Sequence, residues 1–480
     1  MASKIAQSTY SYSYSPARGQ VGTSTYSGGT SGDVIASRIG VVTSYIDPVT
    51  SATVYLSGDT KVFYFLEGTA NKALVAVTQW DYSTTPPTAT CQYLIFDADQ
   101  DEVGPNYNWG SPLYGPATWT LGSTALANLY KIQGTTISST FYLYGIDYDA
   151  GIAFRLYRSG STYVLDTSNY FTFTKPTTAG EGRGVDLQIE GSNVYTLYIS
   201  GTDLTSGPPS ASYLNSTVVK TNMTFGSPTY KGPHGSVLTP GEDELWPTEN
   251  AFSIQPYGTN FLLVAVGGPQ HYDNSWNPNS RIQTVAFSDL EVNDLLRAAT
   301  TGEAATYPDD CYDFRALVFA NTGTPADDEV FILTGKYNSS YVMNWRLYHT
   351  TMNRVLAATG VRINALSPAP TVTSASDIPG YLWALLYSAS YNKVWFAQGN
   401  QLAIYQYTAS PASVNRVGDV EAIGSLSNLT SASLNSITIY GGEAAPMTLK
   451  GYTAPAFVSN TAAALIERKR LLEQVAAAKE

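Results

Sequence analysis

The chain has 480 residues, of which 43% are hydrophobic and only 13% are charged, and its formal net charge is −12. With 36 tyrosines in so weakly charged a chain, we expect an all-β protein, because aromatic and β-branched residues favour strands. No run of lysine and arginine is longer than three residues, which is too short to follow a phosphate backbone, so we expect no nucleic acid as a partner. No segment approaches the roughly 18 continuous apolar residues of a membrane helix, so no membrane span is expected.

Residues 1–33 are predicted to form a flexible or strand-donating tail, since they are rich in serine, tyrosine, threonine and glycine and show no helical pattern. Tyr10, Tyr12 and Tyr14 alternate with serines, which places three rings on one face of an extended strand. Such a strand would gain backbone hydrogen bonds at a sheet edge, in the same or a neighbouring molecule. No apolar stretch typical of a signal peptide occurs here. We therefore expect a cytoplasmic protein or one exported by another route, for instance to the cell surface.

Residues 34–459 are predicted to form a single β-propeller domain because they contain an internal repeat. The segments 141–165 and 331–356 both begin with the pattern F-x-L-x-G. Both then reach R-L-Y, at Arg155 and Arg346, and both continue to a Val-Leu pair nine residues after the arginine. Each segment is typical of a β-hairpin, in which two alternating strands are joined by a loop.

Weaker copies of this hairpin recur about every sixty residues along the chain, at 73–96, 194–219, 261–287 and 393–407. A further strand precedes most hairpins, so each unit holds at least three strands. Six such units fit a six-bladed β-propeller, whose radial repetition leaves only short edges. The strand-like segment 436–442 either closes the ring with the first blade or begins a seventh blade. Two stacked β-sandwiches are the alternative layout.

Two helices are expected outside this pattern. Residues 460–480 contain no glycine or proline and are rich in alanine, leucine, glutamate, lysine and arginine, which predicts a C-terminal α-helix. The apolar residues of one face of this helix are Leu465, Leu472 and Val475. A short helix is predicted over 288–300, where a serine and a glutamate three residues later match a capping box.

The clearest metal-like motif is incomplete. Asp97, Asp99 and Asp101 occupy the first, third and fifth positions of a calcium loop. Glu102 replaces the glycine that the loop needs at position 6, and Asn108 replaces the glutamate at position 12. The three aspartates are therefore weak candidates for a calcium site, and no other cofactor is predicted.

Catalytic signatures are missing from the sequence. No nucleophile, Walker or dinucleotide motif occurs, and the three histidines are scattered. His349 is expected at the surface, and nothing in the sequence decides whether Cys91 and Cys311 are bonded. Acidic clusters occur, but nothing ties a pair of carboxylates to one pocket, as glycosidase chemistry requires. The clusters lie at 241–246, 307–313 and 325–330. We therefore predict that the chain is not an enzyme.

Two functions remain. The first is a structural subunit that self-assembles into a homopolymer or sheath through Tyr10, Tyr12 and Tyr14 and the apolar face of the C-terminal helix. The second is a lectin-like propeller whose blade loops bind glycans, because exposed aromatic rings beside polar residues suit sugars. The candidate glycan-binding residues are Trp80, Trp109 and Trp276.

Overall fold

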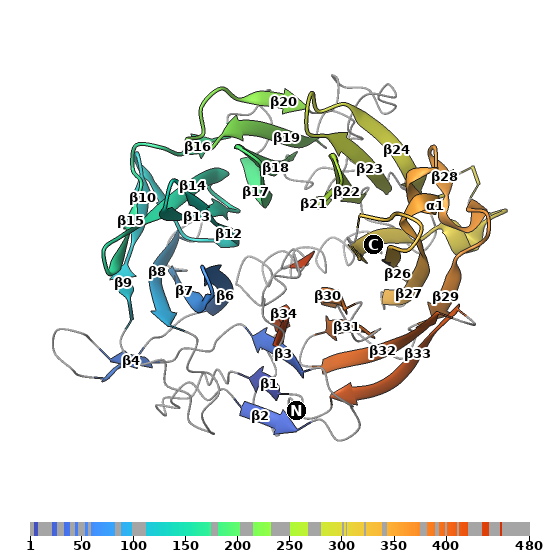
Figure 1. Ribbon diagram of the computed structural model, residues 1–480, viewed down its shortest axis with the longest axis horizontal. Helices are drawn as coiled ribbons and strands as arrows, with labels where there is room; N and C mark the ends of the chain where they lie inside the picture. The colour runs from blue at the N-terminus through green and yellow to red at the C-terminus, as the bar shows by residue number, and fades with distance from the viewer. Residues whose placement is uncertain are drawn as a thin grey trace, which may run out of the picture.

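The computed structural model describes most residues between 59 and 420, together with short strands on either side. The described ranges are 4–7, 22–25, 33–38, 44–46, 53–55, 59–81, 88–97, 112–173, 181–201, 215–231, 250–266, 280–299, 302–303, 305–320, 323–337, 343–374, 382–388, 393–398, 401–409, 412–420, 434–440 and 452–453. Within these ranges the protein is almost entirely β-structure, with mainly antiparallel sheets set around a common centre (Figure 1). The predicted all-β, propeller-like architecture is confirmed, and the stacked-sandwich layout is wrong.

Six sheets of four or five strands are found in the described ranges. Sheet 1 contains β6 (Asp59–Glu67), β7 (Ala70–Asp81), β8 (Thr88–Asp97) and β9 (Tyr114–Ala117). Sheet 2 contains β12 (Leu129–Ile137), β13 (Thr140–Asp147), β14 (Ile152–Ser159), β15 (Thr162–Leu165) and β16 (Phe171–Thr172). Sheet 3 contains β17 (Glu181–Glu190), β18 (Asn193–Gly201), β19 (Asn215–Asn222) and β20 (Thr229–Lys231).

The second half of the ring follows the same plan. Sheet 4 contains β21 (Asn250–Tyr257), β22 (Asn260–Val266), β23 (Arg281–Ala286), β24 (Val292–Arg297) and β28 (Val361–Arg362). Sheet 5 contains β25 (Asp313–Phe319), β26 (Glu329–Tyr337), β27 (Met343–Thr351) and β29 (Thr371–Ser374). Sheet 6 contains β30 (Leu382–Ser388), β31 (Lys393–Gln398), β32 (Gln401–Ala409), β33 (Ala412–Val420) and β35 (Tyr452–Thr453).

All six predicted hairpins are confirmed as the second and third strands of a sheet. The hairpins are β7–β8, β13–β14, β18–β19, β22–β23, β26–β27 and β31–β32. The strand that precedes each hairpin lies toward the centre, and the chain then runs outward to the rim, as β6 to β9 and β17 to β20 show (Figure 1). The alternation of apolar and polar residues therefore correctly predicts the two middle strands of each of these six sheets.

The R-L-Y repeat also corresponds to equivalent positions in two sheets. Arg155 lies on β14 and Arg346 on β27, the third strand of sheets 2 and 5. Each guanidinium pairs with an aspartate and lies over a tyrosine ring. The repeat ends there, because Val164 lies in β15 whereas Val355 lies in the short helix α1 (Met352–Leu356).

The inner strands share a feature that the sequence pattern does not reveal. Five of the six inner strands, β12, β17, β21, β25 and β30, carry a one-residue register shift near their start, where they pair with the second strand. Asp186 lies just after the shift in β17, is 2% exposed and pairs with Lys131 just after the shift in β12. The Asp186 carboxylate also accepts a hydrogen bond from the Ile254 N–H of β21 (2.9 Å). One buried carboxylate therefore links the inner strands of three consecutive sheets.

The core lies between neighbouring sheets rather than within one of them. One cluster joins sheets 1 and 2, where Tyr93 stacks on Trp119 with ring centroids 3.7 Å apart. Trp119 belongs to a small hairpin between these sheets, formed by β10 (Trp119–Leu121) and β11 (Thr124–Leu126). Close contact requires a glycine at Gly184, because a Cβ there would lie 2.4 Å from Ile146 of sheet 2. Apolar contacts between sheets are therefore what hold the ring together.

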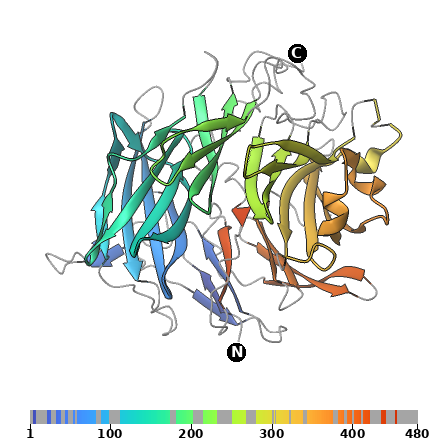
Figure 2. The same ribbon diagram turned by 45° about the horizontal axis from the view of Figure 1, so that its top comes forward.

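A strand near the N-terminus and a strand near the C-terminus pair in one sector of the ring. The strand β3 (Asp33–Arg38) pairs antiparallel with β34 (Leu434–Tyr440), so the predicted strand at 436–442 is found. Its partner is the N-terminal segment and not sheet 1. A hairpin of β1 (Lys4–Gln7) and β2 (Gly22–Thr25) has its first strand beside β3. Figures 1 and 2 show the blue N-terminal strands next to the red C-terminal strand. A second small hairpin, β4 (Ser44–Ile46) with β5 (Thr53–Tyr55), follows β3.

Three local predictions have clear outcomes. The helix predicted over 288–300 is wrong, because this segment makes a turn with Leu290 at a positive φ of 63° and then forms strand β24. His349 is buried at 5% exposure and contacts the Glu329 carboxylate, so its predicted surface position is also wrong. Cys91 and Cys311 lie in separate buried clusters, and no disulfide joins them. The predicted helix at 460–480 lies outside the described residues.

Candidate functional site

The residues predicted for self-association are not among those that the structure describes. Tyr10, Tyr12 and Tyr14 fall in the connection between β1 and β2, and Leu465, Leu472 and Val475 fall beyond β35. The structure does describe β1 and β2, the strands on either side of the three tyrosines. These two strands pair with each other, and β1 contacts β3, which pairs with β34.

The predicted glycan-binding and calcium-binding residues are not brought together in the described part of the chain. Trp80 lies in β7, while Trp109 and Trp276 lie outside the described residues. Asp97 ends β8 and has its carboxylate 3.4 Å from the Lys72 ammonium, while the other two calcium candidates are not described. Among the described residues, no group of three or more histidine, cysteine, aspartate or glutamate side chains is placed to hold a metal ion.

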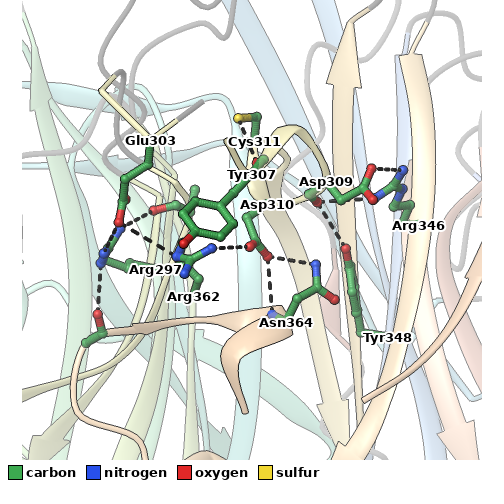
Figure 3. A network of polar contacts seen from close by, with 12 residues as sticks. Arg297, Glu303, Tyr307, Asp309, Asp310, Cys311, Arg346, Tyr348, Arg362 and Asn364 are labelled. Atoms are coloured by element: carbon green, nitrogen blue, oxygen red, sulfur yellow. Dashed lines mark hydrogen bonds and ion pairs between the residues drawn. The ribbon is translucent and has the colours of Figure 1, made fainter. Parts of the chain in front are cut away.

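One predicted acidic cluster lies within a network of polar contacts. It belongs to the described residues between β24 and β25, which are 298–299, 302–303 and 305–312 and are here called the β24–β25 loop (Figure 3). Backbone hydrogen bonds close the loop on itself, from Tyr307 N to Glu303 O (2.8 Å) and from Ala299 N to Asp310 O (2.8 Å). Its tip is the short 3₁₀ helix η2 (Pro308–Asp310), which begins at a proline, a residue whose fixed φ suits a helix start.

The base of the loop is held by a two-pronged ion pair. Arg297, the last residue of β24, donates from Nη1 to Glu303 Oε2 (2.5 Å) and from Nη2 to Glu303 Oε1 (2.9 Å). Its Nε donates to the Gly360 carbonyl (2.9 Å). The hydrogen bonds to Glu303 raise the pKa of Arg297 above its ordinary value, so the pair is charged.

A second arginine fixes the opposite side of the loop. Arg362, in β28, donates from Nη1 to Asp310 Oδ2 (3.0 Å), and its Nε lies 3.7 Å from Glu303 Oε1. Asn364 donates its side-chain Nδ2 to Asp310 Oδ1 (2.7 Å). The Arg362 guanidinium carbon lies 3.2 Å from the centre of the Tyr307 ring. This cation–π contact fixes the orientation of the tyrosine.

The neighbouring carboxylate turns toward sheet 5. Asp309 Oδ1 accepts a hydrogen bond from Arg346 Nη2 (2.8 Å), while its backbone carbonyl accepts from Arg346 Nη1 (3.2 Å) and the Tyr348 hydroxyl (3.3 Å). The Asp309 side chain is 68% exposed, whereas that of Asp310 is 3% exposed. The two aspartates thus belong to different ion pairs and do not share a pocket, as Figure 3 shows.

The sequence singled out this loop only in part. The acidic cluster 307–313 was identified, but its partners Arg346, Arg362 and Asn364 lie tens of residues further along the chain. No local pattern marks those arginines as part of one site. Tyr307, the exposed aromatic at the centre of the network, was overlooked because tyrosine is so common in this chain.

Comparisons with known proteins come from structure alone. No protein-family model matches the sequence, and no curated protein matches it. A protein from Lactobacillus plantarum is 8% identical over 78% of this chain and 89% of its own, with a TM-score of 0.43. The extracellular domains of Drosophila semaphorin 1b are 7% identical over 79% and 83%, with a TM-score of 0.41. A Trypanosoma rangeli sialidase is 8% identical over 79% and 58%, with a TM-score of 0.39.

The prediction that the chain is not an enzyme is contradicted by these comparisons. Besides the sialidase, the similar structures include an exo-β-1,3-galactanase from Phanerochaete chrysosporium and an α-L-arabinofuranosidase from Podospora anserina. At these identities and TM-scores the likeness assigns none of these activities to the present chain.

Among the described residues, no helix has the length and hydrophobicity to cross a membrane.

Proposed function

We propose that the protein is a structural subunit that self-associates through the sector where β3 pairs with β34, here called the terminal sector. The observation that supports this most directly is that pairing, which places a strand from each half of the sequence side by side on the ring. We further propose that β34, β3, β1 and β2 form a seventh blade in that order from the centre to the rim. The neighbouring positions of β3 and β1 support this order.

In this arrangement Tyr10, Tyr12 and Tyr14 belong to the connection between β1 and β2, the two outermost strands of the proposed blade. A strand in which Tyr10, Tyr12 and Tyr14 share one face would pair its backbone with a sheet edge of a second molecule and cover three rings there. Because sheet edges present unpaired N–H and C=O groups, this mode of addition needs no preformed pocket. Repeated head-to-tail, the contact would give a homopolymer or sheath.

The experiment compares the full chain with a variant in which Tyr10, Tyr12 and Tyr14 are all replaced by serine. This variant keeps β3 intact, whereas deletion of residues 1–33 would remove Asp33, the first residue of that strand. A Tyr230→Ser variant is the matched control, because Tyr230 is exposed on β20 at the rim of sheet 3.

Assembly is measured by negative-stain microscopy and by light scattering on a size-exclusion column. We expect filaments or large oligomers from the full chain and from the control, and uniform single particles from the triple variant. A full chain that stays monomeric at high concentration would contradict the proposal, and so would a triple variant that assembles normally.

A further inference from the structure

We infer that the β24–β25 loop is a binding site for a neutral saccharide, with the ring of Tyr307 as its stacking platform. The inference does not depend on self-association, since the loop lies between sheets 4 and 5, away from the terminal sector (Figure 1). It rests on three properties of the loop, namely the exposure of the ring, its fixed orientation and the charge balance around it.

The first property is an aromatic ring left open to solvent. Among the side chains whose exposure the structure describes, only three large hydrophobic ones are exposed, and Tyr307 is one of them at 39%. The Arg362 guanidinium covers one face of the ring. The other face of the ring is therefore the one on which the C–H groups of a pyranose would stack.

The second property is that the platform is built before any ligand arrives. Arg362 is fixed from behind by the buried Asp310, and the Tyr307 backbone is tied to Glu303 and to the Cys311 thiol, whose Sγ lies 3.4 Å from the Tyr307 carbonyl oxygen. A ring that is already immobile loses little conformational entropy on binding. Sites that recognise small polar ligands are usually preformed in this way.

The third property selects the class of ligand. The network contains three arginines and three carboxylates, and every guanidinium is engaged by a carboxylate. An anionic ligand would have to displace one of these ion pairs. An exposed ring in a network without net charge fits a neutral sugar.

The test uses the full chain on an array of neutral oligosaccharides of glucose, galactose, mannose and fucose, with sialylated and sulfated glycans as the anionic arm. We compare the wild type with Tyr307→Ala, with Tyr307→Phe, which keeps the ring, and with the matched control Tyr230→Ala. Binding to the neutral sugar that responds is then titrated at 50 mM and at 500 mM NaCl, and thermal unfolding confirms that each variant is folded.

We expect Tyr307→Ala to weaken binding of a neutral sugar by about tenfold or more, because an apolar ring face is no longer covered. Tyr307→Phe and Tyr230→Ala should bind like the wild type, and salt should have little effect, since no charge pair forms. The inference is overturned if no neutral glycan binds, if only anionic glycans bind, or if Tyr307→Ala binds as well as Tyr230→Ala. None of these results bears on assembly through the terminal sector.

Discussion

The two arginines of the R-L-Y repeat allow the effect of burial on the stability of an ion pair to be measured in one protein. Arg155 and Arg346 occupy equivalent positions on β14 and β27, and each pairs with an aspartate. The Arg155 and Asp166 side chains are 8% and 11% exposed, whereas those of Arg346 and Asp309 are 21% and 68% exposed. Replacing each arginine by methionine keeps the apolar stem and removes only the charge and its hydrogen bonds.

The expected losses of folding stability differ because the aspartate that loses its arginine is buried in one variant and exposed in the other. In Arg155→Met, Asp166 stays in a buried site without its cation, and a buried pair broken in this way costs about 3–5 kcal/mol. The Met223 carbonyl loses the Arg155 donor but keeps the Tyr144 hydroxyl, so it adds little. In Arg346→Met the exposed aspartate is hydrated again, and the cost should stay at about 1 kcal/mol or below.

Urea unfolding followed by the fluorescence of the eight tryptophans measures both variants under the same conditions. A difference of about 3 kcal/mol between the variants should appear as a clearly lower midpoint for Arg155→Met at an unchanged slope. Equal midpoints for the two variants would refute the reasoning, because the repeat makes every factor except burial similar. A lower midpoint for Arg346→Met would refute it more strongly.

Three further predictions concern pH, close packing and turn geometry. Burial alone would raise the pKa of Asp166, but hydrogen bonds from its neighbours lower it below the ordinary value of 3.8. The stability that the ionised Asp166 contributes is therefore present above pH 3.8 and is lost as the pH falls through the folded-state pKa. Urea titrations should show that the Asp166→Asn variant loses less stability than the wild type between pH 5 and pH 2. Gly184→Ala should cost about 1–3 kcal/mol by the same assay, because the new Cβ would overlap Ile146; an unchanged midpoint would contradict the close approach of sheets 2 and 3. Ser138 and Ser139 both have positive φ in the two-residue turn between β12 and β13, so replacing them with asparagine and glycine should raise the melting temperature through a gain of about 0.5–1 kcal/mol, and a loss would show that the turn is not of type I′.

The middle strands of each sheet could be predicted because their signal is local. Alternating apolar residues and a repeat of about sixty residues are properties of a short window, and they identified β7 to β8 as well as β26 to β27. The helix predicted over 288–300 failed because its capping pattern is also compatible with a turn. Leu290 adopts a positive φ there, and the following residues pair with β23 as an outer strand. Tertiary pairing outweighed a weak local preference.

The candidate site could be predicted only in fragments, because its contacts connect distant segments. The cluster 307–313 was visible, but nothing near it indicates that Arg362 stacks on Tyr307 or that Arg346 pairs with Asp309. Likewise, the strand-like character of 436–442 was readable, whereas its pairing with β3 depends on the closure of the whole ring. Register shifts in the inner strands leave no pattern in composition or periodicity at all.

The pairing of β3 with β34 has a consequence for synthesis. β3 leaves the ribosome early, but its partner β34 follows about 400 residues later, which at 5–20 residues per second is a delay of about 20–80 s. During that interval the nascent N-terminal strand has an unpaired edge close to other chains on the same messenger RNA. The order of translation thus gives each new molecule a period in which a neighbour can reach β3 before its own C-terminus does.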